Sequence, residues 1–297
     1  MCTGVAGGAT APRGEDAVSA TDAAGREFRD RYGAWALVAG ASEGMGAQFA
    51  GQIASRGVNL VLVARRANLL RDLCETLAAE HGIEARAVAV DLAHPNALLE
   101  VAKATDGLEV GLLVYNAAHS RIGPFLDDPL EEHLKALAVN CRGPLMFSHT
   151  FGRAMADRGR GGILLMSSLA GGQGAPGIAN YAATKAYDTV LAEGLWGELR
   201  PRGVDVLACC AGATRTPRYL ASQRESGHGG MAAPEMEPGQ VVAEALAALG
   251  KKPSMIPGIA NRGAAWLMQR LLPRRTAVAI MGRSTLGMRS PDTPERD

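Results

Sequence analysis

The sequence has no long apolar run, no cysteine framework and no excess of charge of one sign. Its uninterrupted apolar stretches stay below about 18 residues, so we expect no membrane-spanning helix. Its five cysteines, at positions 2, 74, 141, 209 and 210, include no Cys-x-x-Cys pair, which argues against a disulfide framework or a zinc site. The formal net charge of +1 provides no electrostatic footprint for a nucleic acid. We therefore expect neither a nucleic-acid partner, nor a metal, nor an integral membrane segment.

The first thirty residues are mostly small and polar, and they lack the basic start and long apolar centre of a secretory signal. We expect residues 1–30 to form a flexible tail and the protein to stay in the cytoplasm, whose reducing conditions suit unpaired cysteines. The rest of the chain is different. Of the 297 residues, 47% are apolar, which is enough for a substantial core without a second domain.

Apolar runs alternate with amphipathic segments along the chain, as a doubly wound parallel sheet requires. Strands are expected at 36–39, 59–64, 85–90, 110–115, 162–167, 204–210 and 254–256. Helices are expected at 46–55, 68–79, 96–104, 130–157, 181–199 and 239–249. This pattern predicts an α/β fold, with one Rossmann-fold domain over residues 31–256 and helices on both faces of a sheet of about seven strands. Ligands bind such sheets beyond the carboxyl ends of the strands, where the strand order reverses.

Three glycines follow the first expected strand and precede a helix. Glycine permits tight turns and lets a pyrophosphate approach the backbone, and the helix N-terminus adds unpaired N–H groups. The spacing Gly-x-x-x-Gly-x-Gly differs from the common dinucleotide fingerprint, so this segment alone is a weak signal. Its candidate cofactor-binding residues are Gly40, Ser42, Glu43, Gly44, Met45 and Gly46.

Tyr181 and Lys185 are one helical turn apart, and Ser168 precedes Tyr181 by thirteen positions. A tyrosine is a poor acid or base at neutral pH, but a cation held beside it favours the phenolate. The two side chains lie on one helix face, where this effect operates. The spacing alone also fits a half-buried tyrosine beside a solvated lysine, and it indicates acid–base catalysis without histidine only together with the other motifs.

Together these motifs resemble the classical short-chain dehydrogenase/reductase family over roughly residues 33–250. The motifs that carry the resemblance are Gly40-Ala-Ser-Glu-Gly-Met-Gly46, Asp91-Leu92, Asn116-Ala117-Ala118, Asn140, Ser167-Ser168, Tyr181-x-x-x-Lys185 and Ala211-Gly212-x-x-x-Thr216. Within the family, residues 60–66 and 256–275 are most similar to the DltE-like and 17β-hydroxysteroid-dehydrogenase-like reductases. The resemblance implies an oxidoreductase that interconverts a ketone and a secondary alcohol on an apolar small molecule. The alternative is a protein that keeps the fold and senses or scaffolds without turnover.

The resemblance assigns four catalytic positions. Tyr181 is the general acid in reduction and the base in oxidation, and Lys185 favours its ionised form and holds the nicotinamide ribose, so both also belong to the cofactor site. Ser168 donates a hydrogen bond to the developing alkoxide. Asn140 is expected to hold a water that links Lys185 to solvent, or else to bond nearby backbone from inside its helix.

Two arginines end the second expected strand, and no Asp or Glu lies between positions 58 and 71. An NAD enzyme usually places an acid there for the adenosine ribose, whereas an arginine fork suits the 2′-phosphate of NADP. We therefore expect NADP(H) rather than NAD(H), with Arg65 reading the phosphate and Arg66 supporting it. Glu43 departs from this pattern, because many NADP-preferring relatives carry a basic residue inside the glycine loop.

The remaining cofactor contacts are implied by the resemblance. They are Asp91 and Leu92 at the adenine, Asn116, Ala117 and Ala118 at the adenine ribose, and Gly212, Thr214 and Thr216 near the nicotinamide carboxamide. Ala118 and Ala211 replace a glycine and a proline of the family pattern. Asp91 also suits a helix N-cap, and both roles are compatible with its position.

The substrate side is less specific. Residues 217–238 are expected to be a substrate lid with Tyr219, Leu220, Met231 and Met236 as an adaptable wall, or else a surface loop. Residues 257–297 are expected to be a helical extension and tail that covers the pocket, packs on a partner subunit or lies on an anionic membrane. Relatives pair through two long helices, here at 130–157 and 181–199, which implies a homodimer or homotetramer. The identity of the substrate stays open among steroids, ketoacyl thioesters, polyketides and other apolar ketones.

Overall fold

The computed structural model describes residues 14–226 and 234–285, and residues 1–13, 227–233 and 286–297 lie outside the described part. Its centre is a parallel sheet of seven strands in the order β3-β2-β1-β4-β5-β6-β7. The strands are β1 Trp35–Ala39, β2 Asn59–Ala64, β3 Ala85–Ala89, β4 Val110–Tyr115, β5 Gly161–Ser168, β6 Val204–Ala211 and β7 Ser254–Met255. The predicted α/β class and all seven predicted strands are confirmed, with bounds that differ by one residue at most.

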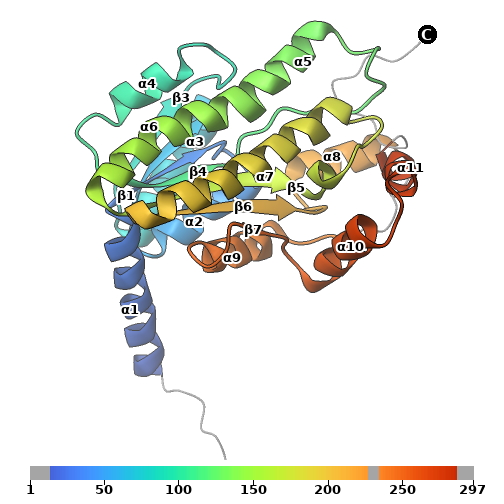
Figure 1. Ribbon diagram of the computed structural model, residues 1–297. Helices are drawn as coiled ribbons and strands as arrows, with labels where there is room; N and C mark the ends of the chain where they lie inside the picture. The colour runs from blue at the N-terminus through green and yellow to red at the C-terminus, as the bar shows by residue number, and fades with distance from the viewer. Residues whose placement is uncertain (1–13, 227–233, 286–297) are drawn as a thin grey trace, which may run out of the picture.

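Helices cover both faces of the sheet (Figure 1). They are α1 Gly14–Tyr32, α2 Gly44–Ala54, α3 Ala67–His81, α4 Ala97–Ala104, α5 Leu130–Leu137, α6 Gly143–Arg158, α7 Ala179–Leu199, α8 Pro217–Ser226, α9 Pro238–Ala248, α10 Ile259–Arg270 and α11 Arg274–Thr285. Three short turns are η1 Ala138–Arg142, η2 Leu169–Gly172 and η3 Arg200–Arg202. Side chains of α2, α3 and α9 share one buried cluster, and those of α4, α6 and α7 share the other. The core therefore consists of two layers separated by the sheet.

The strand order reverses at β1, which pairs in parallel with both β2 and β4. Every residue of β1 and β4 is buried, which explains why these strands read as continuous apolar runs. The chain leaves β1 at Gly40, whose N–H donates to Val63 O at 2.7 Å. A ligand site is therefore expected where β1, β2 and β4 end, which is the edge to which the glycine-rich turn belongs.

The helix predicted over 130–157 is present as a continuous helical run, in which a π-turn, η1, lies between α5 and α6. Pro144 favours the π-turn, since it has no N–H to donate to the carbonyl of Asn140 four residues earlier. Within the turn, Gly143 N–H donates to Ala138 O, and Val139 O accepts the hydroxyl of Tyr115 at 2.8 Å. A proline inside a helical pattern was the available signal for this irregularity.

The flexible tail expected over residues 1–30 is corrected for residues 14–30, which belong to α1. The last turns of this helix pack by Phe28 and Tyr32, whose ring centroids are 4.7 Å apart. Tyr32 is buried, and its hydroxyl donates to Asp205 Oδ2 at 2.9 Å. Gly33 then ends the helix with a positive φ of 79°. Two aromatic residues four positions apart, followed by glycine, were a helix signal inside an otherwise polar segment.

The lid expected at 217–238 is a helix rather than a loop over residues 217–226, where α8 lies, and residues 227–233 are outside the described part. The C-terminal extension forms two helices, α10 and α11, up to residue 285. Figure 1 shows α8, α10 and α11 gathered beyond the arrowheads of β5 and β6. These three helices therefore stand at the strand ends where catalytic side chains are expected.

Candidate active site

The three proposed reacting side chains come from adjoining elements at the end of β5. Ser168 is the last residue of β5, and Tyr181 and Lys185 lie on the first turns of α7. Lys185 Nζ is 5.8 Å from the centroid of the Tyr181 ring. Tyr181 also packs against a small buried cluster that includes Ala170, two residues beyond Ser168. The fold therefore places the ammonium over the phenol ring and brings the end of β5 beside them.

The two consecutive serines have different surroundings. Ser167 is buried, and its hydroxyl donates to Lys185 O at 2.6 Å. Ser168 is half-buried, and its Oγ accepts from Ala170 N at 3.2 Å, which leaves its O–H available as a donor. Ser167 thus anchors α7 to the sheet, whereas Ser168 is the serine that keeps a donor for a substrate.

Lys185 is buried and tightly held. Its ammonium donates to Met166 O at 2.7 Å and to Asp188 Oδ2 at 2.9 Å. Burial is the largest influence on Lys185 and lowers the pKa of its ammonium, but the Asp188 carboxylate together with Tyr181 and Cys141 more than offsets burial, so the pKa is raised. Asp188 was missed in the sequence, because a polar residue one turn after Lys185 reads as part of a solvated helix face.

Asn140 lies in the π-turn and is fully buried. Its Nδ2 donates to His119 O at 2.9 Å and to Thr184 Oγ1 at 3.0 Å, and its Oδ1 accepts from His119 N at 2.7 Å. Both amide N–H groups are therefore used by the protein, and one lone pair of Oδ1 is left for a water. Asn140 joins the loop after β4 to the first turn of α7, and π-turns are frequent at functional sites.

The glycine-rich turn is packed too closely for side chains. A Cβ at Gly46 would lie 1.9 Å from Gly40 O, and one at Gly40 would lie 2.7 Å from the backbone of Ala117. Gly40 and Gly44 also have positive φ angles of 81° and 57°. Close packing and these backbone angles bring α2 onto the end of β1, so its N-terminal N–H groups face the cleft, as a pyrophosphate requires.

One cleft brings together most of the predicted cofactor residues. Those that line it are Gly40, Ser42, Glu43, Met45, Arg65, Arg66, Asp91, Leu92, Asn116, Ala117, Ala118 and Thr216. The cleft also includes His119 and Lys135. The described geometry thus gathers side chains from the ends of β1, β2 and β4, as a dinucleotide site at a strand reversal does.

The two arginines at the end of β2 differ in their partners. Arg66 Nη2 lies 3.0 Å from Glu43 Oε1 and donates to Ser42 Oγ at 2.8 Å. Arg65 is exposed, and no ion pair or hydrogen bond of its guanidinium occurs within the described chain. Arg65 is therefore free to bind an anion in the cleft, whereas the charge of Arg66 is partly neutralised by Glu43.

Polar residues after β3 and β4 fix the far wall of the cleft. Asn116 Nδ2 donates to Gly40 O at 2.9 Å, which ties the end of β4 to the glycine turn. Asp91 Oδ1 accepts from Ala93 N at 2.9 Å in the turn before α4. Helix α4 begins later, with Asn96 at its N-cap, so Asp91 does not cap that helix.

The predicted nicotinamide loop after β6 is only partly at the cleft. Thr216 lines the cleft and lies against Gly44, where an added Cβ would be 3.1 Å from Thr216 Cγ2. Thr214 is buried, with its hydroxyl donating to Gly212 O at 3.0 Å. Gly212 packs on Asn261, because a Cβ there would lie 2.9 Å from its Nδ2. Gly212 and Thr214 therefore shape the loop, and Thr216 is its side chain nearest the glycines.

Two further walls adjoin Tyr181. Met281 of α11 packs against the same buried cluster as Ile178 and Tyr181, so the C-terminal extension covers part of the site. On another side, His119 Nε2 lies 2.7 Å from Glu132 Oε2, and both residues line a pocket that includes Tyr181. Burial lowers the pKa of His119, although the hydrogen bond to Glu132 partly opposes this, so a neutral imidazole is expected near pH 7.

Helix α8, which lies at the expected lid, is hydrogen-bonded to the loop after β4. Arg218 donates to Ser120 O at 2.6 Å, and the hydroxyl of Tyr219 donates to Glu235 Oε1 at 3.0 Å. Leu220 is half-buried in α8, and Met236 packs against the core below α9. Met231 lies outside the described residues. Helix α8 is therefore attached to the loop that carries His119, which is consistent with a wall over the cleft.

Two kinds of site are absent from the described residues. No group of three or more His, Cys, Asp or Glu side chains among them could hold a metal ion. None of the helices within residues 14–226 and 234–285 is long and apolar enough to cross a membrane.

Comparisons with known proteins agree on one family. Residues 34–226 match the family model described as short chain dehydrogenase. The chain is 35% identical over 237 residues to a 7β-hydroxysteroid dehydrogenase of Collinsella aerofaciens, which covers 79% of this chain and 90% of that protein. A solved 7β-hydroxysteroid dehydrogenase superposes with a TM-score of 0.80 at 31% identity, over 85% of this chain and 98% of that one. A short-chain dehydrogenase from Sphingobium yanoikuyae, solved in complex with NADPH, gives a TM-score of 0.67 at 30% identity, over 78% and 91% of the two chains.

Proposed function

This chain belongs to the short-chain dehydrogenase/reductase family as an oxidoreductase that acts on a CH–OH group, and we propose that it interconverts a ketone and a secondary alcohol with NADP(H). The observation that carries the proposal is the placement of Lys185 over the ring of Tyr181, at a distance of 5.8 Å, beside the end of β5. A phenol next to a buried ammonium is suited to exchange a proton with a substrate oxygen.

In the direction of reduction, Tyr181 gives its proton to the carbonyl oxygen as negative charge develops there. Ser168 donates a second hydrogen bond to the same oxygen, which stabilises the transition state because the donor is already oriented. Lys185 favours the phenolate left on Tyr181. In oxidation the phenolate removes the proton from the alcohol. The nicotinamide supplies or accepts the hydride when it is bound, and the packed turn at Gly40 and Gly46 fits its pyrophosphate.

The preference for NADP(H) rests on charge at the end of β2. Arg65 lines the cleft without a protein partner in the described chain, and Arg66 stands beside it. An arginine fork binds a phosphate through two hydrogen bonds, whereas the ribose hydroxyls of NAD(H) call for an acidic partner. Glu43 weakens the preference because it pairs with Arg66 at 3.0 Å. The expected order is NADP(H) above NAD(H), with residual activity with the latter.

The proposed substrate is a bulky, mostly apolar ketone of the hydroxysteroid type. The similarity to 7β-hydroxysteroid dehydrogenases supports this class, and so does the apolar packing of Met281 and Ile178 beside Tyr181. His119 and Glu132 add polar groups at the margin of the site, where a substrate hydroxyl finds partners. The pocket beside Tyr181 therefore combines a few apolar side chains, such as Ile178, with a larger number of polar and charged ones.

We also propose a cytoplasmic homodimer or homotetramer that pairs through α5, α6 and α7. Large apolar side chains are exposed on these helices, including Leu134 at 54%, Leu145 at 48% and Val190 at 68%. Exposed apolar side chains that recur along neighbouring helices mark a surface that excludes water on association. Light scattering of the purified protein tests the assembly, and the double substitution Leu145→Ser with Val190→Ser is expected to lower the mass by half.

The function is tested by NADPH oxidation, followed by absorbance, with a panel of polycyclic ketones, straight-chain 3-ketoacyl thioesters and small aliphatic ketones. We expect turnover with at least one bulky ketone and weak or no turnover with the small ones. Tight NADPH binding without turnover on any ketone would instead support a dinucleotide-sensing or scaffold protein.

A further inference from the structure

Lys185 and Asp188 form a buried ion pair one turn apart on α7. Lys185 Nζ is 2.9 Å from Asp188 Oδ2, and the two side chains are 3% and 2% exposed. The second oxygen of Asp188, Oδ1, is also buried and has no hydrogen-bond partner within the described chain. A buried carboxylate with an unpartnered oxygen does not stabilise a fold well, because the free-energy cost of removing it from water exceeds the attraction gained from one ion pair. This carboxylate therefore calls for a role other than stability.

The hydrogen bonds of the Lys185 ammonium indicate what Asp188 does. Of its three N–H groups, one donates to Met166 O at 2.7 Å and one to Asp188. The third N–H has no such partner in the described chain and is available toward Tyr181, whose ring centroid lies 5.8 Å from Lys185 Nζ. Asp188 thus fixes the direction of the free N–H and also offsets part of the positive charge that Tyr181 experiences.

We propose that Asp188 is a positioning residue that holds Lys185 against β5 and raises the pH at which the Tyr181 hydroxyl loses its proton. This favours the proton-donating phenol and hence carbonyl reduction. The proposal rests on the proposed function, since it concerns the same proton transfer. It follows from the Coulomb law: a carboxylate beside an ammonium weakens the field of the ammonium at a third group nearby. Nothing in it requires Asp188 to touch the substrate.

Other ionisable groups face this pair from the elements packed against it. They are Tyr115 on β4, Cys141 and Arg142 on η1, Tyr187 on α7 and Cys210 on β6. Burial raises the pKa of Tyr115, Tyr187 and Cys210, and it raises that of Cys141 to about 11. Burial thus favours the neutral form of each of these thiols and phenols, and Arg142 carries positive charge, so none of them replaces the negative charge of Asp188.

The test is the isosteric substitution Asp188→Asn, with Asp188→Ser as a smaller uncharged variant should the amide not be accommodated. The rate of alcohol oxidation at saturating substrate is measured from pH 5.5 to 10.5. We expect the midpoint of the rising limb to move down by about one pH unit, which is a tenfold change in the proton equilibrium. Asp188→Glu is the matched control: it keeps the charge and is expected to keep the wild-type midpoint while kcat falls.

A lower kcat with an unchanged midpoint in both uncharged variants would overturn the proposal, because a merely structural role has that signature. A second measurement distinguishes a failure of the role proposed for Asp188 from a failure of the proposed function. The ultraviolet phenolate absorbance of wild type minus Tyr181→Phe reports the ionisation of this tyrosine without any substrate. If no ketone is turned over but this titration still moves down in Asp188→Asn, the proposed function fails and the role of Asp188 stands.

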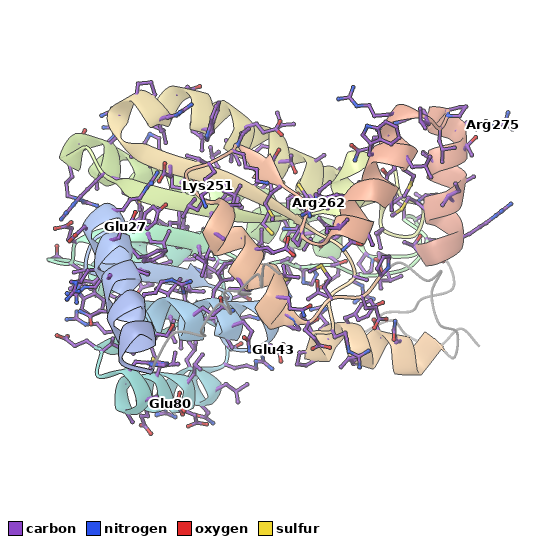
Figure 2. The ribbon with its side chains drawn as sticks, turned by 90° about the horizontal axis from the view of Figure 1, so that it is seen from below. Glu27, Glu43, Glu80, Lys251, Arg262 and Arg275 are labelled. Atoms are coloured by element: carbon purple, nitrogen blue, oxygen red, sulfur yellow. The ribbon has the colours of Figure 1, made fainter. Side chains whose placement is uncertain are left out.

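A different observation concerns the outer face of α10. Residues 245–285 contain seven Lys and Arg and no Asp or Glu, whereas the whole chain has a net charge of only +1; one of the seven, Arg262, pairs with Glu244 at 3.3 Å. Along the same helix and its end, four large apolar side chains are exposed: Ile259 at 81%, Trp266 at 59%, Leu271 at 59% and Leu267 at 49%. Figure 2 looks onto the side that carries α9 and α10, where Lys251 and Arg262 are labelled, with Arg275 beyond them.

The positive charge and the exposed apolar side chains of the α10 face together indicate what kind of surface it binds. Ile259 and Trp266 are two turns apart on one stripe, and Leu267 and Leu271 follow one turn apart, so the apolar side chains share a broad face. Arg270 lies at the end of α10, and Arg274 and Arg275 begin α11, so pairing this face with a second copy would bring like charges together, which is unfavourable. We infer that the face docks on an anionic lipid surface, with Trp266 in the interface and the arginines over the headgroups.

Co-sedimentation with vesicles tests this surface. The full chain is mixed with vesicles of pure phosphatidylcholine or with 30% phosphatidylglycerol added, at low and high salt. We expect binding to the anionic vesicles that weakens with salt, and a loss of about tenfold or more in Trp266→Ser and in Arg270→Gln with Arg275→Gln. Leu99→Ser, an exposed leucine on α4, is the control that keeps binding. Equal binding by Trp266→Ser, or a lower oligomer mass of that variant without any vesicle binding by wild type, would overturn the inference.

Discussion

Replacing Arg65 by alanine should separate the two nicotinamide cofactors more clearly than any other single change. Arg65 lines the cleft and its guanidinium has no partner in the described chain, so its donors are free for a 2′-phosphate. A hydrogen bond to a charged group contributes about 1.5–3 kcal/mol. Two such bonds at the lower end, reduced for solvent exposure, give roughly 2–3 kcal/mol, or about 30- to 150-fold in kcat/KM with NADPH.

The neighbouring residues provide graded controls. Arg66 is already paired with Glu43, and these side chains are 49% and 44% exposed, so Arg66→Ala should cost only about 0.5–1 kcal/mol, a factor of about two to five. Glu43→Gln removes the carboxylate that neutralises Arg66 and should improve kcat/KM with NADPH by about twofold to threefold.

The assay compares initial rates with NADPH and NADH for wild type and the three variants at one ketone concentration. The values with NADH should stay within about twofold for Arg65→Ala, because the ribose hydroxyls do not need the guanidinium. Equal losses with both cofactors would show that Arg65 maintains the shape of the site. Unchanged kcat/KM with NADPH would refute the assignment of the 2′-phosphate site to the end of β2.

Three further outcomes follow from packing and ionisation. Gly46→Ala should prevent folding or lower the free energy of unfolding by roughly 3 kcal/mol or more, since its Cβ would lie 1.9 Å from a backbone oxygen. The control Gly194→Ala, with open space around it in α7, should raise the free energy of unfolding by about 0.5–1 kcal/mol. Urea denaturation measures both changes, and a mild effect at Gly46 would contradict the tight turn. His119 is half-buried and its pKa is lowered, so its contribution to stability should be complete above about pH 6.5 and should decline as the pH falls, because the unfolded chain then binds more protons. His119→Gln should flatten that decline, and an equally steep curve would exclude this cause. Burial raises the pKa of Cys141 to about 11, so iodoacetamide should label it slowly at pH 8 and faster as pH 11 is approached, as mass spectrometry of the peptide would show; rapid labelling at pH 8 would contradict its buried surroundings.

The parts of the fold that could be predicted from the sequence are those set by local pattern. Strands such as β1 and β4 are buried throughout, so each reads as a continuous apolar run with clear ends. The glycine turn could be predicted because a positive φ and close backbone approach both demand glycine. Acid–base catalysis was indicated by the spacing of Tyr181 and Lys185, and the resemblance of several motifs to one family indicated an oxidoreductase, with which the comparisons agree.

Features that depend on distant partners could not be predicted. Tyr32 bonds Asp205, which lies 173 positions away, so the docking of α1 had no local signal beyond its aromatic spacing. Asp188 reads as a solvated residue until the sheet is known to bury it. Met281 is likewise an ordinary tail residue in the sequence, and only the folding of α11 back over the strand ends brings it to the cluster that Tyr181 packs against.

The most direct test of the account is the rate of a single turnover of NADPH with a ketone substrate by Tyr181→Phe, with the Kd for NADPH measured in parallel. The substitution removes one hydroxyl from a half-buried ring and leaves the packing beside Ala170 in place. We expect the rate to fall by about 10²- to 10⁴-fold while the Kd stays within about twofold, because the substitution removes the proton donor but only one of the many groups expected to contact the cofactor. A Tyr181→Phe protein that turns over at the wild-type rate would contradict it.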